Sequence, residues 1–155
     1  MAVYTHIPAE DMAALVHAFG AGDLLSAKGI AEGVENSNYL LDTTDGRFIL
    51  TVYEKRVDTN DLPFFLSLID HLADNGCPVP RARHAADGAA TLVWRGKFIA
   101  LIEFAEGLSV SHPTPAQAHA VGAALGQVHK AAASFNLNRP NSLGPEGWFD
   151  LAERC

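Results

Sequence analysis

The sequence predicts an α+β fold in which a five-stranded antiparallel sheet, with a helix packed on it, occupies residues 1–104. Three observations support this. β-rich runs flank Asp45-Gly46, a pair that tolerates the positive φ angles of a tight hairpin turn. Apolar residues recur at helical spacing over residues 62–72, and a nearly uninterrupted apolar run at residues 98–104 is typical of a strand buried on both faces. Residues 105–155 are predicted to be a linker and the start of a second, helical unit.

The first elements have distinct start and stop signals. Pro8 suits a first helical position and Gly20 a helix end, which predicts a helix over residues 8–19. Strands are expected at residues 24–30, 39–41 and 48–53, and the Asp45-Gly46 turn joins the last two.

The next expected elements are a second helix and two further strands. A second helix begins near residue 60, where Asn60 or Asp61 can cap it, and it ends at Gly76. The two remaining strands, residues 91–94 and 98–104, are joined by a turn at Arg95-Gly96.

A long helix dominates the remainder of the chain. Thr114 and Pro115 supply its cap and first residue, and its apolar face continues to about residue 133. Residues 138–147 are expected to form a loop. The apolar cluster after it has nothing later in the chain to pack on; it consists of Trp148, Phe149 and Leu151.

Composition and charge narrow the function classes. Of the 155 residues 48% are apolar, enough for a core, and 11 Lys and Arg stand against 18 Asp and Glu, a net charge of −7. Such a chain repels a phosphate backbone, so we expect no nucleic-acid partner. No apolar stretch is long enough to cross a bilayer, no basic and apolar leader is visible, and two cysteines fit a reducing compartment. We therefore expect a soluble, cytoplasmic protein without membrane partners.

The connection between the first two expected strands is the first candidate for chemistry. Gly29 and Gly33 allow a ligand to approach the backbone closely, and Asn36, Ser37 and Asn38 add side-chain donors. The stretch matches neither the Gly-Lys-Ser/Thr phosphate loop nor the Gly-x-Gly-x-x-Gly pattern. Taken alone, the stretch is interpreted by default as an ordinary β-turn.

The order of elements around that connection is that of a protein-kinase-like small lobe. Residues 29–41, 48–56 and 60–66 resemble the bacterial homoserine kinases of the aminoglycoside-phosphotransferase-like fold. Residues 102–107 resemble the hinge of that superfamily, and residues 121–129 resemble the first helix of its large lobe. Arg139-Pro-Asn141 also fits. The resemblance thus extends along nearly the whole chain.

The resemblance implies an ATP-dependent kinase that phosphorylates the side-chain hydroxyl of L-homoserine in threonine biosynthesis, with Mg²⁺. Residues 1–104 would be the nucleotide-binding small lobe, and residues 105–155 the hinge and the start of the large lobe. The glycine-containing connection would cover the phosphates, and the hinge backbone would bind the adenine edge. The implied ATP-binding residues are Gly29, Gly33, Glu35, Asn36, Ser37, Asn38, Thr51, Lys55, Glu103, Phe104 and Ala105.

Two departures from the kinase pattern stand out. Thr51 occupies the third-strand position where kinases place a phosphate-binding Lys, and Phe65 occupies the position of its helix Glu partner. Lys28 or Lys55 can supply the charge from elsewhere, or the loop binds the phosphates without it. Both lysines are equally consistent with solvated charges at strand ends.

The catalytic loop of the superfamily is absent. None of the seven histidines begins a His-x-Asp motif, so we find no catalytic residue and no metal ligand, and we predict that the chain alone is inactive as a kinase. Cys77 is interpreted as an inert thiol. The alternatives are a choline- or aminoglycoside-type kinase of the same fold, or a non-catalytic nucleotide-binding or interaction module. We also consider a homo-oligomer formed through the exposed C-terminal end.

Overall fold

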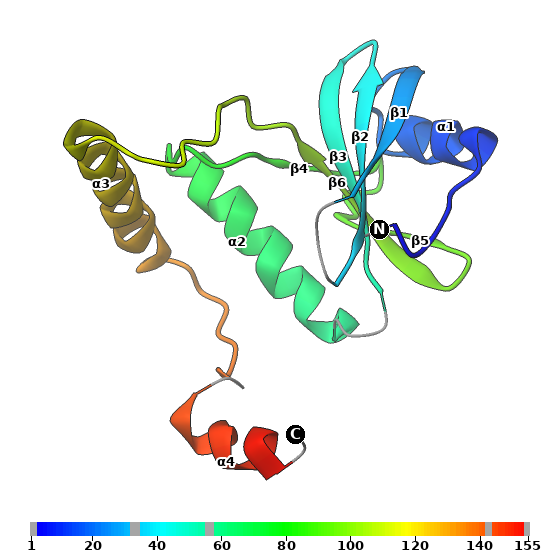
Figure 1. Cartoon of the computed structure of the whole chain (residues 1–155). Coiled ribbons are helices and arrows are strands. Elements are labelled where there is room, and N and C mark those ends of the chain that lie inside the picture. The colour runs from blue at the N-terminus through cyan, green and yellow to red at the C-terminus, as the bar shows by residue number, and fades with distance from the viewer. Residues whose placement is uncertain (1–2, 32–34, 55–57, 142–143, 154–155) are drawn as a thin grey trace.

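A six-stranded antiparallel sheet with a helix against each face forms the first part of the chain (Figure 1). The structure is a computed structural model, and it describes residues 3–31, 35–54, 58–141 and 144–153. In chain order the elements are α1 (Ala9–Ala18), β1 (Leu24–Ile30), β2 (Ser37–Thr43), β3 (Gly46–Val52), the 3₁₀ helix η1 (Thr59–Asp61), α2 (Leu62–Asp74), β4 (Ala82–Arg83), β5 (Leu92–Trp94), β6 (Lys97–Glu103), α3 (Pro115–Ala132) and α4 (Pro145–Glu153).

The strands follow the order β1-β2-β3-β6-β4, and β5 pairs with β6 as a hairpin. Strand β6 therefore lies inside the sheet, which explains its apolar sequence, and Ile99, Ala100 and Leu101 are fully buried. The predicted Asp45-Gly46 hairpin is present, with Gly46 at a φ of 140°. The sheet places the ends of β2, β3 and β6 side by side, although they are far apart in the sequence.

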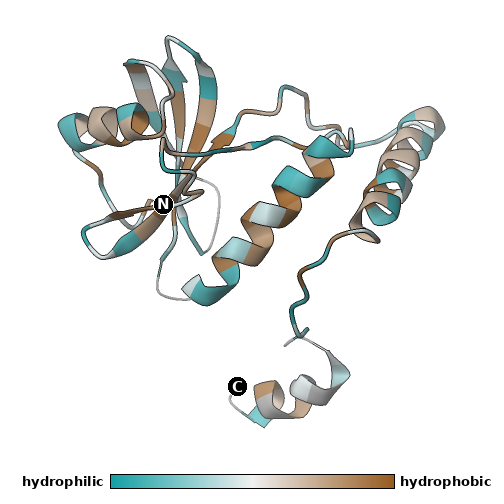
Figure 2. Cartoon of the chain, turned by 180° about the vertical axis from the view of Figure 1, so that it is seen from behind, coloured by the Kyte–Doolittle hydropathy of each residue, from teal (hydrophilic) through white to brown (hydrophobic). Residues whose placement is uncertain are grey.

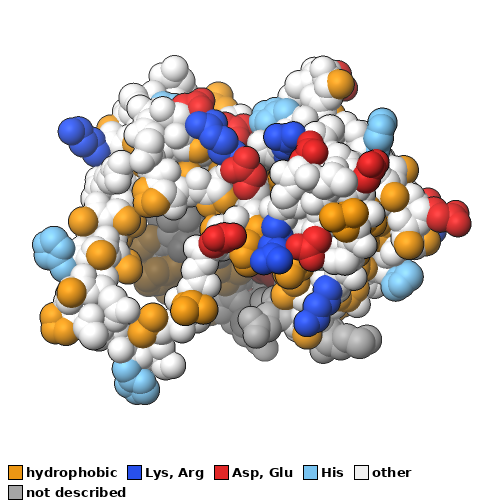
Figure 3. Space-filling view, turned by 90° about the horizontal axis from the view of Figure 1, so that it is seen from above, with side chains coloured by type: hydrophobic (Ala, Val, Ile, Leu, Met, Phe, Trp, Pro, Cys, Tyr) orange, Lys and Arg blue, Asp and Glu red, His pale blue; other side chains and the backbone are white. Residues whose placement is uncertain are grey.

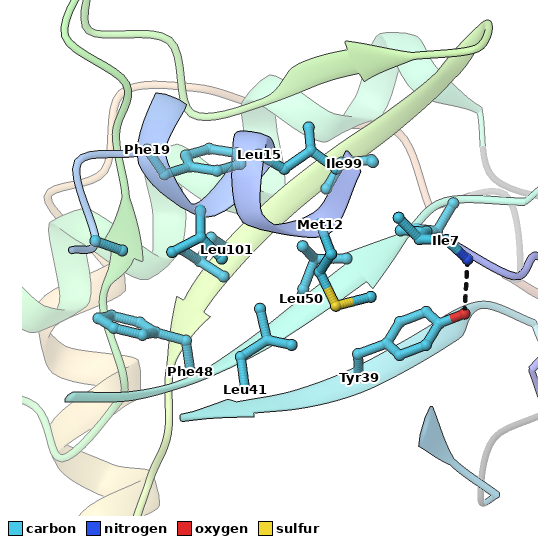
Figure 4. Packing of buried hydrophobic residues seen from close by; sticks show 13 residues of the cluster. Ile7, Met12, Leu15, Phe19, Tyr39, Leu41, Phe48, Leu50, Ile99 and Leu101 are labelled. Atoms are coloured by element: carbon cyan, nitrogen blue, oxygen red, sulfur yellow. Dashed lines mark hydrogen bonds between the residues drawn. The ribbon is translucent and has the colours of Figure 1, made fainter. Parts of the chain in front are cut away.

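The main core lies between α1 and the sheet (Figure 4). Met12, Leu15 and Val16 are buried at helical spacing on one side of α1. They meet every second residue of the central strands, since side chains alternate between the faces of a sheet. The strand residues of this core are Tyr39, Leu41, Phe48, Leu50, Val52, Ile99 and Leu101.

Helix α2 borders the opposite face of the sheet. Its Leu66 packs with Ala82 and Ala100, and Tyr53 and Ile102 lie against this smaller cluster. Hydrophobic and hydrophilic residues alternate along α2 (Figure 2). Gly76, at a φ of 75°, ends the helix as predicted.

Three expectations about local structure were wrong. The sheet has six strands instead of five, because the two-residue β4 gains its hydrogen-bond partners from the edge of β6, which no local pattern reveals. Neither Asn60 nor Asp61 caps α2 with its side chain. Instead Asp58 accepts from the Asn60 N–H and caps η1. Residues 138–147 are not all loop, since α4 begins at Pro145.

The predicted long helix is present as α3, and Thr114 and Gln117 form a reciprocal capping box at its start. Its apolar face is not covered by any described residue along most of its length: Val121 and Leu125 are exposed. The apolar residues of α4 are exposed as well, with 80% of Phe149 accessible. In the part of the chain that the structure describes, no helix is both long and apolar enough to span a bilayer.

Candidate functional site

Three rows of side chains cross the sheet face that α2 borders, because residues directly opposite one another in antiparallel strands share a face. The first row, nearest the β1–β2 connection, contains Ile30, Asn38, Thr51 and Ala100. The middle row contains Lys28, Leu40, Ile49 and Ile102. The outer row contains Ser26, Asp42 and Arg47, beside Phe104. Neighbouring rows lie about 7 Å apart along the strands.

The middle row provides an apolar floor. Leu40 and Ile49 are half-buried, yet neither belongs to the two packed clusters of the core. Ile102 is the β6 residue of this row, and it is the last apolar residue of that strand. Seen from above, the surface is hollowed beside α3 (Figure 3). Because Leu40, Ile49 and Ile102 are apolar and only half-buried, the floor can take a flat apolar ring against its face.

The segment that follows β6 borders this floor with backbone groups. The Glu103 N–H donates to the Arg81 carbonyl at 2.9 Å, and the Phe104 N–H donates to the Arg47 carbonyl at 3.0 Å. Among the described residues none donates to the Glu103 carbonyl oxygen, and none accepts from the Ala105 N–H. One acceptor and one donor, two residues apart, thus remain for a ligand that lies on the floor.

The first row is polar at its centre. The Thr51 hydroxyl donates to Asn38 Oδ1 at 2.9 Å, across β2 and β3. Because this bond uses the amide oxygen, the NH₂ group of Asn38 remains as the donor for a ligand. The structure thus brings together Asn38 and Thr51, two of the residues predicted from the sequence.

Other predicted residues lie elsewhere. Ser37 is fully buried on the α1 face. Gly29 sits within β1, where a Cβ atom would approach Val3 Cγ2 to 2.9 Å, so its lack of a side chain accommodates the N-terminal segment. Asn36 Oδ1 accepts from the Glu54 N–H at 3.3 Å, and Glu35 is exposed. The predicted site residues Gly33 and Lys55 lie outside the described residues.

The first row itself contains no cation. Lys28 shares the face but lies in the middle row, on the edge strand β1. Phe65 cannot substitute for a helix carboxylate, because its side chain carries no charge, and its ring lies 5.2 Å from the Arg139 guanidinium. Tyr53, the residue after β3, packs instead against the cluster that contains Leu66 of α2, and burial raises the pKa of the Tyr53 hydroxyl.

The outer row forms a charged rim that the sequence interpretation did not single out. Arg47 Nε donates to Asp42 Oδ1 at 2.8 Å, and Ser26 donates to Asp42 Oδ2 at 2.9 Å. The bond from Arg47, followed by the bond from Ser26, holds the pKa of Asp42 below its usual range. The Arg47 guanidinium also lies 5.4 Å from the ring centre of Phe104. In the sequence, the only local sign of this rim is that Asp42 and Arg47 flank the Asp45-Gly46 turn.

Metal ligands do not gather in this region. Across the described ranges, no group of three or more His, Cys, Asp or Glu side chains is arranged to hold a metal ion. Cys77 is buried as a free thiol at the end of α2.

Comparison with known proteins gives a consistent result. Residues 26–155 match the phosphotransferase enzyme family. A homoserine kinase from Chelativorans sp. (strain BNC1) is 52% identical over 155 residues, which cover 99% of this chain and 48% of the relative. A homoserine kinase from Rhizobium meliloti (strain 1021) is 49% identical over 153 residues, which cover 97% and 46%. The chain thus spans about half the length of the curated relatives it matches.

A solved structure supports the fold. The crystal structure of a spectinomycin phosphotransferase, in complex with ADP and spectinomycin, matches with a TM-score of 0.67 at 18% identity. The match covers 97% of this chain and 46% of that one. The predicted α+β, kinase-like small-lobe architecture is confirmed.

Proposed function

Because the chain belongs to the phosphotransferase enzyme family, we propose that it is the nucleotide-binding part of a homoserine kinase. Such an enzyme transfers the γ-phosphoryl group of ATP to the side-chain hydroxyl of L-homoserine, on the route to threonine. In this proposal residues 1–104 form the small lobe, and residues 105–155 form the hinge and the start of the large lobe. L-homoserine is proposed as the acceptor because the relatives that are about 50% identical to the chain are homoserine kinases.

One observation carries the nucleotide assignment: an apolar floor and a polar row follow each other on the same sheet face, beside unused backbone groups. The adenine ring would lie on Leu40, Ile49 and Ile102, with its edge at the Glu103 carbonyl and the Ala105 N–H. A ribose separates a base from its phosphates by roughly the distance between neighbouring rows, about 7 Å. The phosphates would then reach Asn38 and Thr51.

Phosphate binding would depend chiefly on neutral donors. Asn38 offers its NH₂ group, and Lys28 is a cation on the same face, one row away from Asn38. The β1–β2 connection would cover the phosphates, as the resemblance to the homoserine kinases implies. The charged rim of Asp42 and Arg47 would border the entrance beside Phe104.

The described residues do not fit a magnesium site, since they hold no suitable cluster of ligands. They also lack the carboxylate that orients an attacking hydroxyl in phosphoryl transfer. We therefore assign no catalytic step to this chain. The proposed activity requires the half of the relatives' length that the chain does not span.

Calorimetric titration of the chain with a non-hydrolysable ATP analogue tests the nucleotide assignment. Ala105→Pro removes the proposed adenine-edge donor and is expected to weaken binding about tenfold, as loss of one hydrogen bond in a dry slot does. Glu106→Pro is the matched control one residue later and should bind normally. Equal affinity of both variants, or no binding by the parent chain, would refute the assignment.

The acceptor is tested in a longer protein. The chain is joined to the C-terminal half of the Chelativorans relative, and phosphate transfer from ATP is measured with L-homoserine, choline and spectinomycin in turn. Selective turnover of L-homoserine is expected. Preference for choline or spectinomycin would favour another kinase of this fold, and a lack of turnover with all three would favour a non-catalytic module.

A further inference from the structure

A polar cluster lies on the α1 face, behind the first row of the nucleotide site. It consists of Thr5, Ser37, Glu54 and Lys97, and we name it the Ser37 cluster. Ser37 is fully buried. Its hydroxyl oxygen accepts from the backbone N–H groups of Tyr4 at 2.8 Å and Thr5 at 3.0 Å. The same hydroxyl donates to Glu54 Oε1 at 2.8 Å.

Glu54 is the charged centre of the cluster. Its carboxylate also accepts from the Thr5 hydroxyl at 2.6 Å and from Lys97 Nζ. Burial acts to raise the pKa of Glu54, but the bonds from Lys97, Thr5 and Ser37 together outweigh it and leave the pKa below its usual range. In the described part of the chain, no buried side-chain donor or acceptor lacks a partner. Such complete satisfaction is what makes a buried polar network rigid.

The cluster fixes the residues at which the β1–β2 connection returns to the sheet. Ser37 is the first residue of β2, and the next residue, Asn38, faces the nucleotide side and pairs with Thr51. Glu54 lies just beyond β3, and its N–H donates to Asn36 Oδ1. The backbone between Asn36 and Asn38 is therefore held from one face while it presents Asn38 on the other.

The N-terminal segment supplies the remaining contacts. We name residues 3–7 the strap. Val3 lies against Gly29 of β1, and Tyr39 of β2 donates its hydroxyl to the Thr5 carbonyl at 2.6 Å while accepting the Ile7 N–H at 3.3 Å (Figure 4). The strap thus touches both strands that lead into the connection. It precedes the part of the chain that matches the phosphotransferase family, which begins at residue 26.

We propose that the strap and the Ser37 cluster position Asn38 and Thr51 for the phosphates of the nucleotide without contacting the nucleotide themselves. This inference rests on the proposed function, since it assigns a role to the back of the same site. Ser37 is a positioning residue, and its effect passes through the shared backbone of residues 36–38. The sequence suggested a phosphate contact for Ser37. In the structure the Ser37 side chain lies on the α1 face of β2, opposite to the face that carries Asn38.

The test uses the 155-residue chain and titration with the ATP analogue. Ser37→Ala leaves two backbone N–H groups without their acceptor and removes one bond to Glu54, and we expect it to weaken nucleotide affinity about fivefold. The matched control is Thr43→Val, at the other end of β2 on the same face, where the buried hydroxyl donates to the Gly46 carbonyl at 3.0 Å. The control should lower thermal stability but leave nucleotide affinity unchanged.

A second pair of variants keeps the test decisive if Ser37→Ala does not fold. Lys97→Met removes the cation that neutralises Glu54, and Lys97→Arg restores it. Nucleotide affinity should fall in the first variant and return towards the parent value in the second. Amide hydrogen exchange of residues 35–38, measured without nucleotide, should be faster in Lys97→Met and near the parent rate in Lys97→Arg.

The outcomes separate the two proposals. No nucleotide binding by the parent chain overturns the proposed function and this inference with it. Binding by the parent chain that neither Ser37→Ala nor Lys97→Met weakens overturns this inference alone. Equal weakening by Ser37→Ala and Thr43→Val also overturns it, because the effect would then follow general stability.

Discussion

Asp61 and Arg139 form an ion pair with 2.6 Å between Oδ2 and Nε, although 78 residues separate them in the sequence. The pair joins the start of α2 to the segment after α3. The Arg139 guanidinium also lies 5.2 Å from the ring centre of Phe65. Near the other end of α2, His71 Nε2 lies 3.0 Å from the Ala131 carbonyl oxygen of α3. Helix α2 thus connects the sheet to the helical part of the chain.

The Asp61–Arg139 pair should contribute measurably to stability, because its side chains are only 27% and 29% exposed. A double-mutant cycle with Asp61→Ala and Arg139→Ala is expected to give a coupling of about 1 kcal/mol in urea unfolding. The control is the Asp74–Arg81 pair, which has the same 2.6 Å separation but exposures of 66% and 47%. A larger coupling in the control would contradict the role assigned to burial.

The sheet core should determine the stability of the first part of the chain. Leu50 is fully buried between α1 and the sheet, so Leu50→Ala is expected to lower the free energy of unfolding by about 2–5 kcal/mol. Leu25→Ala, at a residue that is 67% exposed, should change it by less than about 0.5 kcal/mol. Urea unfolding followed by circular dichroism measures both, and similar losses would show that the core lies elsewhere.

His84 should make stability depend on pH. Its Nδ1 lies 2.9 Å from the Gly88 carbonyl oxygen and its Nε2 lies 2.6 Å from Asp70 Oδ2, so both bonds need a doubly protonated ring. The bond to Gly88, followed by the bond to Asp70, raises the pKa of His84 above 6.5. Because the folded-state pKa is the higher one, this stabilisation is complete below the unfolded pKa and is lost as pH rises through the folded pKa.

The measurement is the difference in melting temperature between the parent chain and His84→Gln. The difference should be largest near pH 6, below the unfolded pKa of about 6.5, and should shrink as pH rises above the folded pKa. The effect will be small, since the His84 side chain is 41% exposed. A difference that grows with pH would contradict the assigned protonation state.

The chain alone should not turn over substrate. It contains no His-x-Asp motif, and its described residues hold no metal cluster. In-line phosphoryl transfer without those groups lacks both the orienting carboxylate and the metal that neutralises the developing charge. Incubation with ATP, Mg²⁺ and L-homoserine should yield no phosphohomoserine by mass spectrometry. Product above the protein-free control would refute this prediction.

The exposed apolar residues of α3 and α4 should cause self-association at high concentration. Leu125 and Phe149 are exposed, and surface of this kind associates when it has no covering partner. Sedimentation velocity should show larger species as concentration rises, and Leu125→Gln combined with Phe149→Ser should reduce them. Val93→Thr, at an exposed residue of the β5–β6 hairpin, is the control and should leave the distribution unchanged.

Much of the candidate site could be predicted from the sequence, but not the face of the sheet on which each of its residues lies. The Asp45-Gly46 turn and the strand pattern place Thr51 in one strand and Asn38 directly before the neighbouring strand, and the apolar run before Glu103 predicts the edge of the floor. The expected strand begins at residue 39, so the sequence does not place Ser37 and Asn38 on opposite faces of a strand. No local pattern shows that Ser37 joins a cluster with Thr5, Glu54 and Lys97. Those partners come from three distant segments, and only strand register brings them together.

The sequence by itself determined most of the segments that become helices and strands, where most of them end, and which family the chain resembles. The segments follow from the sequence because caps, turns and hydrophobic period act over a few residues. Only the tertiary structure decided which face each polar residue serves, that Asp61 pairs with Arg139 instead of capping its helix, and that β4 joins the sheet. The reason is physical: a carboxylate or an N–H group bonds with whichever partner the packed chain brings within reach, and sequence distance places no limit on that choice.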